Sequence, residues 1–179
     1  VVGISMGGMI AQKVALAAPR RVRTLALLAT HGGGRQALAR PATVRRFIQL
    51  QATKDPQVRL RLFNEILFTP AFVAEHGARL RDGMAKELGG LRQPANGFRG
   101  QMAAVFRHRT GAKLAALHGL PTLIFHGEAD AIVHPRNGHL LKEWMPWAQH
   151  RELPGVGHGI NVQARDTVNA ALLEHFRRG

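Results

Sequence analysis

The sequence predicts an α/β fold with a parallel sheet, and three observations carry that prediction. Three short apolar segments have the length of buried strands, at residues 1–4, 22–29 and 121–125, and a fourth strand is expected at residues 150–153. Helix-forming segments alternate with them, which implies parallel strands covered by helices on both faces. With 45% hydrophobic and 20% charged residues over 179 positions, the chain can bury a core, and we expect one domain with an insertion.

The chain opens on a strand–helix–strand unit. Residues 1–4 (VVGI) have the character of the end of a buried strand, and residues 7–18 follow with helix-forming composition. Pro19 ends this helix, because proline cannot continue helical hydrogen bonding. Residues 22–29 are continuously apolar, which is typical of a buried parallel strand.

The spacing of apolar residues changes after residue 30. Over residues 31–112 apolar positions recur at helical spacing without strand alternation, so we expect an all-helical insertion. Further helices are expected over residues 72–88 and 100–108. The predicted apolar faces consist of Val44, Phe47 and Ile48 on one helix, and of Leu62, Phe63, Ile66 and Leu67 on another.

The strand and helix pattern then resumes. The chain is therefore predicted to have a first core part (1–30), the helical insertion (31–112) and a second core part (113–179). The elements expected in the last part are a strand at 121–125, a turn at 127–130, a helix at 139–145, a strand at 150–153, a glycine-rich loop at 154–159 and an amphipathic helix at 162–176.

Composition excludes several kinds of chemistry. The chain has no cysteine, which removes disulfides, thiolate metal ligands and cysteine nucleophiles, and no tyrosine to act as acid or nucleophile. Serine occurs once, at Ser5. No apolar run approaches the roughly 20 residues that cross a bilayer. The formal charge of +14 is spread along the chain without a nucleic-acid-binding motif, so we expect a basic surface and no nucleic-acid partner.

One motif sits between the first predicted strand and helix. Residues 3–7 (GISMG) match the pattern G-x-S-x-G, in which a tight turn holds Ser5 in a strained conformation. The glycines at both ends let the strand and the helix approach closely. The Ser5 hydroxyl then stands clear of the sheet, and the Met6 N–H can bind an oxyanion that forms beside it.

A serine nucleophile needs a base, and the base needs an orienting acid. In this kind of turn they follow in the order Ser, acid, His. Asp130 comes just after the strand at 121–125, and His158 lies in the glycine-rich loop, so both fall at the same sheet edge as Ser5. Glu128 is an alternative acid, but it falls within the turn that leaves the strand. We therefore predict Ser5 as nucleophile, Asp130 as acid and His158 as base.

Two further patterns are weaker. Residues 31–34 (HGGG) are similar to an oxyanion loop, but that loop precedes the nucleophile in chain order, so we interpret the segment as a flexible start of the helical insertion. The histidines outside the predicted site lack acidic partners at metal-ligand spacing, so we expect no metal. Those considered are His108, His126, His134 and His139.

Three segments together resemble the signature blocks of the α/β-hydrolase superfamily, in particular of members with a helical cap. They are residues 3–8 (GISMGG), 121–130 (PTLIFHGEAD) and 153–159 (LPGVGHG). The resemblance implies a serine hydrolase in which Ser5 is the nucleophile, Asp130 the triad acid and His158 the general base. It also implies that the insertion is the cap that forms the substrate pocket, and that the strands correspond to strands five to eight of that fold.

The resemblance implies a difference in extent as well. Such proteins have about five strands and roughly 100 residues before the nucleophile turn, including the loop that donates a second oxyanion N–H. We therefore expect this chain to be the carboxyl-terminal portion of a larger enzyme. Residues 1–4 would then have an unpaired apolar edge, and the chain alone would fold poorly and catalyse little.

The function expected is hydrolysis of a small-molecule ester or related carbonyl substrate through an acyl-enzyme, without cofactor or metal. The same triad serves carbon–carbon bond hydrolases, lactonases, acyltransferases and cofactor-free perhydrolases, which fold alone does not separate. A hydrolase-like receptor that binds a ligand with its cap is a further alternative. The sequence leaves substrate identity, oligomeric state and compartment open; the default expectation is a soluble, cytoplasmic protein.

Overall fold

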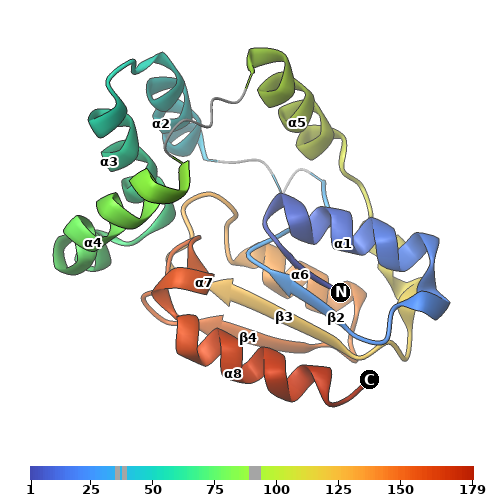
Figure 1. Ribbon diagram of the computed structural model, residues 1–179. Coiled ribbons are helices and arrows are strands. Elements are labelled where there is room, and N and C mark those ends of the chain that lie inside the picture. Colours follow the sequence, from blue (N-terminus) through green and yellow to red (C-terminus); the bar gives the residue numbers. More distant parts are fainter. Residues whose placement is uncertain (35–36, 38–39, 89–93) are drawn as a thin grey trace.

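The structure is a computed structural model that describes residues 1–34, 37, 40–88 and 94–179 (Figure 1). Within these ranges the chain forms a four-stranded sheet in the order β1-β2-β3-β4. All neighbouring strands are parallel, which confirms the prediction. The strands are β1 (Val2–Ile4), β2 (Leu25–Leu28), β3 (Thr122–Gly127) and β4 (Gln149–Leu153).

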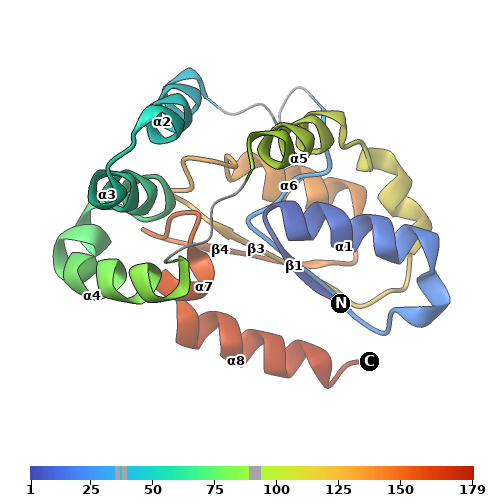
Figure 2. The ribbon, with the colours of Figure 1, turned by 45° about the horizontal axis from the view of Figure 1, so that its top comes forward.

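Helices cover both faces of this sheet, as Figures 1 and 2 show. On one face lie α1 (Met6–Ala17), α6 (Arg136–Trp144) and the 3-10 helix η3 (Gly111–Leu117). On the other face lie α7 (Ile160–Gln163) and α8 (Arg165–Phe176). Each face of the sheet therefore has its own apolar cluster.

Strand β2 runs through the middle of the core. Leu25 and Leu27 pack into the cluster on the α1 face, and Ala26 and Leu28 pack into the cluster on the α8 face. Each of the four residues is at most 2% exposed. Burial on both faces explains why this strand is continuously apolar instead of alternating between apolar and polar residues.

Between β2 and β3, the described part of the chain forms four α-helices before η3, here called the helical insertion: α2 (Pro41–Ala52), α3 (Pro56–Leu67), α4 (Pro70–Leu88) and α5 (Ala95–Arg107). The first three pack one after another, whereas α5 lies apart from them, above α1 in Figure 2. Each of those three begins at a proline, whose fixed φ and missing N–H suit the first helical position. No helix in the described ranges has the length and apolar character needed to cross a membrane.

Some predicted boundaries differ from the structure. The helix expected at 162–176 is two helices, α7 and α8, because the backbone leaves helical geometry at Ala164 (φ −123°, ψ 37°). Helices α5 and α6 begin earlier than predicted, at Ala95 and Arg136. The 3-10 helix η3 has no counterpart among the predicted elements, because its short turn carries no long apolar period.

The predicted apolar face of α2 is wrong in part. Val44 is 44% exposed and Ile48 is 64% exposed, although Phe47 packs against an apolar cluster of the helical insertion. Apolar spacing identifies a helix, but the neighbouring helices determine which of its faces is buried. The buried residues of that cluster are Leu50, Leu62 and Ile66.

Candidate active site

Ser5 lies in the turn between β1 and α1, where the motif predicted it. Its backbone has φ 53° and ψ −121°, a strained conformation that costs a non-glycine residue about 1–3 kcal/mol. The Ser5 N–H donates to the Leu28 carbonyl (2.8 Å), and the Thr30 hydroxyl donates to the Ser5 carbonyl (2.7 Å). The segment at the end of β2 therefore holds the single serine in place.

Close packing at this turn requires glycine at two positions. A Cβ on Gly3 would collide with the backbone of Gly7, and a Cβ on Gly8 would lie 2.6 Å from Thr30 Cβ. A Cβ on Gly7 would meet no heavy atom within 4 Å. The expectation of close approach is thus confirmed at Gly3, but on the helix side the residue without room for a side chain is Gly8 and not Gly7.

Asp130 and His158 form a buried pair beyond the ends of β3 and β4. His158 Nδ1 lies 2.8 Å from Asp130 Oδ2, and the two residues are 6% and 5% exposed. The other oxygen, Asp130 Oδ1, accepts hydrogen bonds from the N–H groups of Ile132 and Val133, both at 2.8 Å. Because an ionised carboxylate only accepts, Nδ1 carries the proton in this contact and His158 Nε2 is left free. Glu128, the alternative acid, is exposed.

A second buried histidine, His126, supports the loop around Asp130. From the sequence, this residue was considered only as a metal ligand. His126 is 0% exposed, and its Nε2 lies 2.9 Å from the Val133 carbonyl and 3.7 Å from Asp130 Oδ2. Burial lowers the pKa of His126, so the neutral ring donates from Nε2 to Val133, whose own N–H binds Asp130. The signal in the sequence is a histidine inside a buried strand, four residues before the predicted acid.

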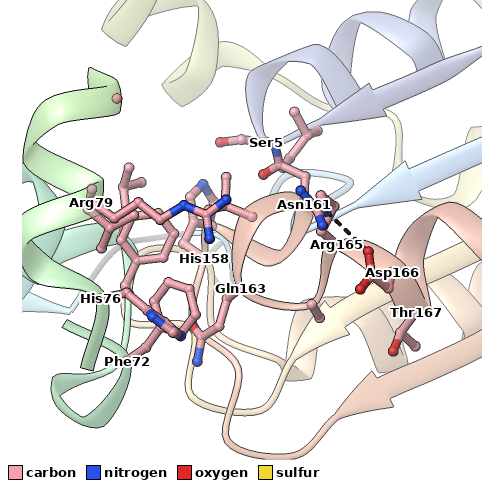
Figure 3. A pocket seen from close by; sticks show the side chains of 18 residues that line it. Ser5, Phe72, His76, Arg79, His158, Asn161, Gln163, Arg165, Asp166 and Thr167 are labelled. Carbon is pink, nitrogen blue, oxygen red and sulfur yellow. Dashed lines mark hydrogen bonds and ion pairs between the residues drawn. The ribbon is translucent and has the colours of Figure 1, made fainter. Parts of the chain in front are cut away.

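Ser5 and His158 line the same cavity, which has a volume of about 830 Å³ (Figure 3). Its walls come from the turn after β1, from the segments after β4 and from α3 and α4 of the helical insertion. In Figure 3, the Arg79 side chain extends from α4 into this cavity toward the side that holds Ser5 and His158. Of the three predicted residues, two therefore face the cavity and Asp130 lies behind His158.

The loop that carries His158 packs against the end of α3. The Gly159 N–H donates to the Leu67 carbonyl (2.8 Å), and a Cβ on Gly157 would lie 2.7 Å from the same oxygen. A Cβ on Gly159 would collide with the ring of Phe68. The glycines beside His158 thus lie in a crowded backbone, because the helical insertion packs directly on this loop.

Residues 31–33 form a buried junction, which corrects the expectation of a flexible start to the helical insertion. The Gln12 side chain of α1 donates to the His31 carbonyl (3.1 Å) and accepts from the Thr110 hydroxyl (2.5 Å). The His108 ring lies 3.3 Å from the same Gln12 oxygen. These hydrogen bonds connect α1 to the segments at both ends of the helical insertion. They also satisfy polar groups that would be costly to bury without partners.

The histidines considered as metal ligands differ in burial and in their hydrogen-bond partners. His108 belongs to the junction, His126 lies behind Asp130, and His134 and His139 are exposed. Among the described residues, no group of three His, Asp or Glu side chains has the geometry of a metal site.

Comparison of the sequence with models of known protein families identifies the family of this chain. The model of a family described as the alpha/beta hydrolase fold matches residues 1–164. The chain belongs to this family. The match confirms the resemblance drawn from the segments around Ser5, Asp130 and His158, and the four-stranded sheet of the described residues corresponds to part of the alpha/beta hydrolase fold.

Individual relatives match nearly the whole of this alpha/beta hydrolase chain. One relative is the protein named "Putative carbamate hydrolase RutD" from Azorhizobium caulinodans. It is 31% identical to this chain over 97% of this chain and 64% of its own length. The pimeloyl-[acyl-carrier protein] methyl ester esterase of Chromobacterium violaceum is 28% identical over 98% of this chain and 69% of its own length. The crystal structure of a hydrolase from Pseudomonas aeruginosa superposes with a TM-score of 0.74 at 26% identity, over 98% of this chain and 63% of that one. The chain thus spans about two thirds of the length of these proteins.

Proposed function

We propose that this alpha/beta hydrolase cleaves an ester or a related carbonyl compound, with Ser5 as the nucleophile. The observation that carries the proposal is the buried Asp130–His158 pair beside the cavity that Ser5 lines. A serine hydroxyl is a weak nucleophile until a base takes its proton, and histidine suits this task when a carboxylate holds its other nitrogen. Because the chain contains one serine, Ser5 is the single candidate.

The first half of the proposed reaction forms an acyl-enzyme. Ser5 Oγ attacks the substrate carbonyl while His158 Nε2 takes the hydroxyl proton, and Asp130 stabilises the imidazolium through Nδ1–H. The Met6 N–H stands at the first position of α1, with no earlier helical turn to which it could donate, and so can bind the oxyanion. His158 then gives its proton to the leaving group, and the acyl group stays on Ser5.

The second half returns the enzyme to its starting state. Water attacks the acyl carbonyl while His158 Nε2 takes one of its protons. The bond between the acyl carbon and Ser5 Oγ breaks, Ser5 takes the proton back, and the carboxylic acid leaves. The balance is one water consumed for each ester cleaved, and it needs neither an oxidant nor a cofactor.

The names of two relatives support this substrate class. One is named for hydrolysis of a carbamate and the other for hydrolysis of a methyl ester. In both compounds the bond to be cleaved joins a carbonyl carbon to a heteroatom, which is where a serine nucleophile attacks. Esters and close carbonyl analogues are therefore the compounds to test first.

A fluorophosphonate probe tests the nucleophile, because it reacts with activated serine hydroxyls. We expect it to label the native full chain, with the adduct located at Ser5 by peptide mass spectrometry. The Ser5→Ala variant lacks any serine and serves as the blank, and His158→Ala should slow labelling at least about 100-fold. Absence of labelling in the native chain, or equal labelling of native and heat-unfolded protein, would contradict the proposal.

A substrate panel separates hydrolysis of esters from the other uses of this triad. We expect turnover of simple esters to exceed that of lactones and of 1,3-diones, measured as kcat/KM with Ser5→Ala as the control. Preferred cleavage of a carbon–carbon bond would overturn the ester assignment. A ligand that raises the Tm without being turned over would instead favour a binding protein.

A further inference from the structure

One helix of the helical insertion presents a regular row of side chains to the cavity. Phe72, His76, Arg79 and Leu80 of α4 all line it, at the spacing that places residues on one face of a helix. The rings of Phe72 and His76 are in edge contact, with centroids 4.5 Å apart. In Figure 3, Phe72, His76 and Arg79 lie on the α4 side of the cavity, and the Arg79 side chain extends toward the side that holds Ser5 and His158.

The charges along the cavity are not balanced. Arg165 and Asp166 line it together and form an ion pair of 3.1 Å, so they offset each other. His76 lies 3.7 Å from Glu75. Arg79 forms no ion pair or hydrogen bond with any residue that the structure describes. Among the described lining residues, the Arg79 guanidinium is therefore the one permanent charge without a counter-charge.

The surroundings of Arg79 favour an anionic partner supplied by the substrate. Leu67, Phe68 and Leu80 contribute apolar surface to the same cavity, and on α4 the polar lining side chains are those of His76 and Arg79. A guanidinium presents paired N–H donors that match the two oxygens of a carboxylate. A substrate held there would have its carboxylate at α4 and its ester carbonyl at Ser5.

We propose that Arg79 selects substrates that carry a carboxylate remote from the ester, so that the enzyme cleaves monoesters of dicarboxylic acids in preference to neutral esters. This inference rests on the proposed function of the same cavity. Arg79 contacts a part of the substrate that does not react, so its contribution is to binding in both the ground state and the transition state. Its removal is therefore expected to raise KM more than it lowers kcat.

Matched substrates test the selection. Monomethyl glutarate and methyl pentanoate have the same carbon chain to the ester and differ in a terminal carboxylate against a methyl group. We expect the full chain to prefer monomethyl glutarate in kcat/KM, and Arg79→Gln to lower the ratio of the two values about tenfold. Arg81→Gln removes a charge from the same helix at a residue that does not line the cavity, and should leave the ratio unchanged.

A binding measurement separates this inference from the proposed chemistry. Ser5→Ala should bind monomethyl glutarate in calorimetry, and Ser5→Ala with Arg79→Gln should bind it about tenfold more weakly. If neither ester is turned over but this binding difference is found, the proposed reaction fails and the anion site stands. Equal affinity in the two variants, or an equal loss of activity toward both esters in Arg79→Gln, would overturn the anion site.

Discussion

Both oxygens of Asp130 are engaged, and each has a different task. Oδ1 accepts two backbone N–H groups of its own loop, whereas Oδ2 accepts from His158 Nδ1. His126 strengthens the same loop by binding the Val133 carbonyl. The position of the carboxylate thus depends on local backbone, and its effect on His158 depends on a single oxygen.

Replacing Asp130 with Asn tests whether the contact of Oδ2 with His158 Nδ1 is needed for activity. The amide oxygen can still accept from the loop N–H groups, but the amide NH₂ would face His158 Nδ1 and favour the wrong tautomer. We expect kcat for an ester substrate to fall about 10³- to 10⁴-fold, while the Tm changes little. Glu128→Gln, an exposed carboxylate two residues earlier, is the matched control and should keep full activity. Similar losses in both variants would argue against the role proposed for Asp130.

The candidate site residues were predictable because each follows a local signal. Ser5 lies in a strand–turn–helix motif, and Asp130 and His158 follow strands that end at one edge of the sheet. Their roles in catalysis, and that of the Met6 N–H, stay predictions. Arg79 was not predictable as a residue of the cavity, because only the packing of α4 near the segments after β1 and β4 places it there. His126 was considered only as a metal ligand, although its position in a buried strand four residues before Asp130 was a signal for its contact with that loop.

At the level of elements, the contact of β1, α1 and β2 determines how Ser5 is presented. Gly8 sits where α1 passes the segment after β2, and Gly7 points to open space. The sequence motif contains Gly7 and suggests that it is the residue needed for close packing. The structure assigns that need to Gly8, one position later.

Alanine at each glycine distinguishes the two positions. Gly8→Ala forces a Cβ against Thr30 and should lower the free energy of unfolding by about 1–3 kcal/mol. Gly7→Ala adds a methyl group in free space on a helix and should raise it by up to about 1 kcal/mol. Urea unfolding of both variants measures the difference. Equal effects at the two positions would show that the close approach of α1 to Thr30 is wrong.

The strands were predicted more accurately than the helices, for a physical reason. Strands β2 and β3 are buried on both faces, so their composition alone identifies them. In the helical insertion, apolar spacing identified the buried face of α2 only in part, because Phe47 packs against the cluster around Leu50 whereas Val44 and Ile48 are exposed. The division of the chain into core residues 1–30, insertion 31–112 and core residues 113–179 stays a prediction.

Across the whole molecule, five of the described histidines have a pKa below the usual value for histidine. Burial lowers the pKa of each, to about 4 for His31 and for His108. Two lie at the junction with the helical insertion, two lie in strands, and one lies in α8 beside the Leu25 carbonyl of β2. A lowered pKa means that the folded state opposes their protonation. The described histidines with a lowered pKa are His31, His108, His126, His150 and His175.

From these lowered pKa values we predict that the folded protein loses stability in mild acid. Below pH 6.5 the unfolded chain takes up protons that the folded His31 and His108 refuse until about pH 4. The free energy of unfolding should therefore fall as the pH drops from 6.5 to 4, by at most about 1.4 kcal/mol per pH unit for each histidine. Urea unfolding at pH 7.5 and pH 5 measures this loss.

A pair of variants assigns the loss to the junction. His108→Asn removes one buried histidine and should reduce the pH dependence, whereas His118→Asn replaces an exposed one and should leave it unchanged. A free energy of unfolding that is the same at pH 7.5 and pH 5 would contradict the predicted direction. So would an equal pH dependence in both variants.

The sequence by itself determined the fold family, the parallel arrangement of four strands and the identities of Ser5, Asp130 and His158 as the candidate site. Those features follow from short-range patterns: apolar runs, a glycine-flanked turn and the positions of polar residues just after strands. Only the tertiary structure decided which oxygen of Asp130 meets His158, why Gly8 cannot carry a side chain and that Arg79 and Ser5 line one cavity. Each of these depends on atoms from segments separated in the chain, and the packing of the strands, their helices and the helical insertion sets the distances between them.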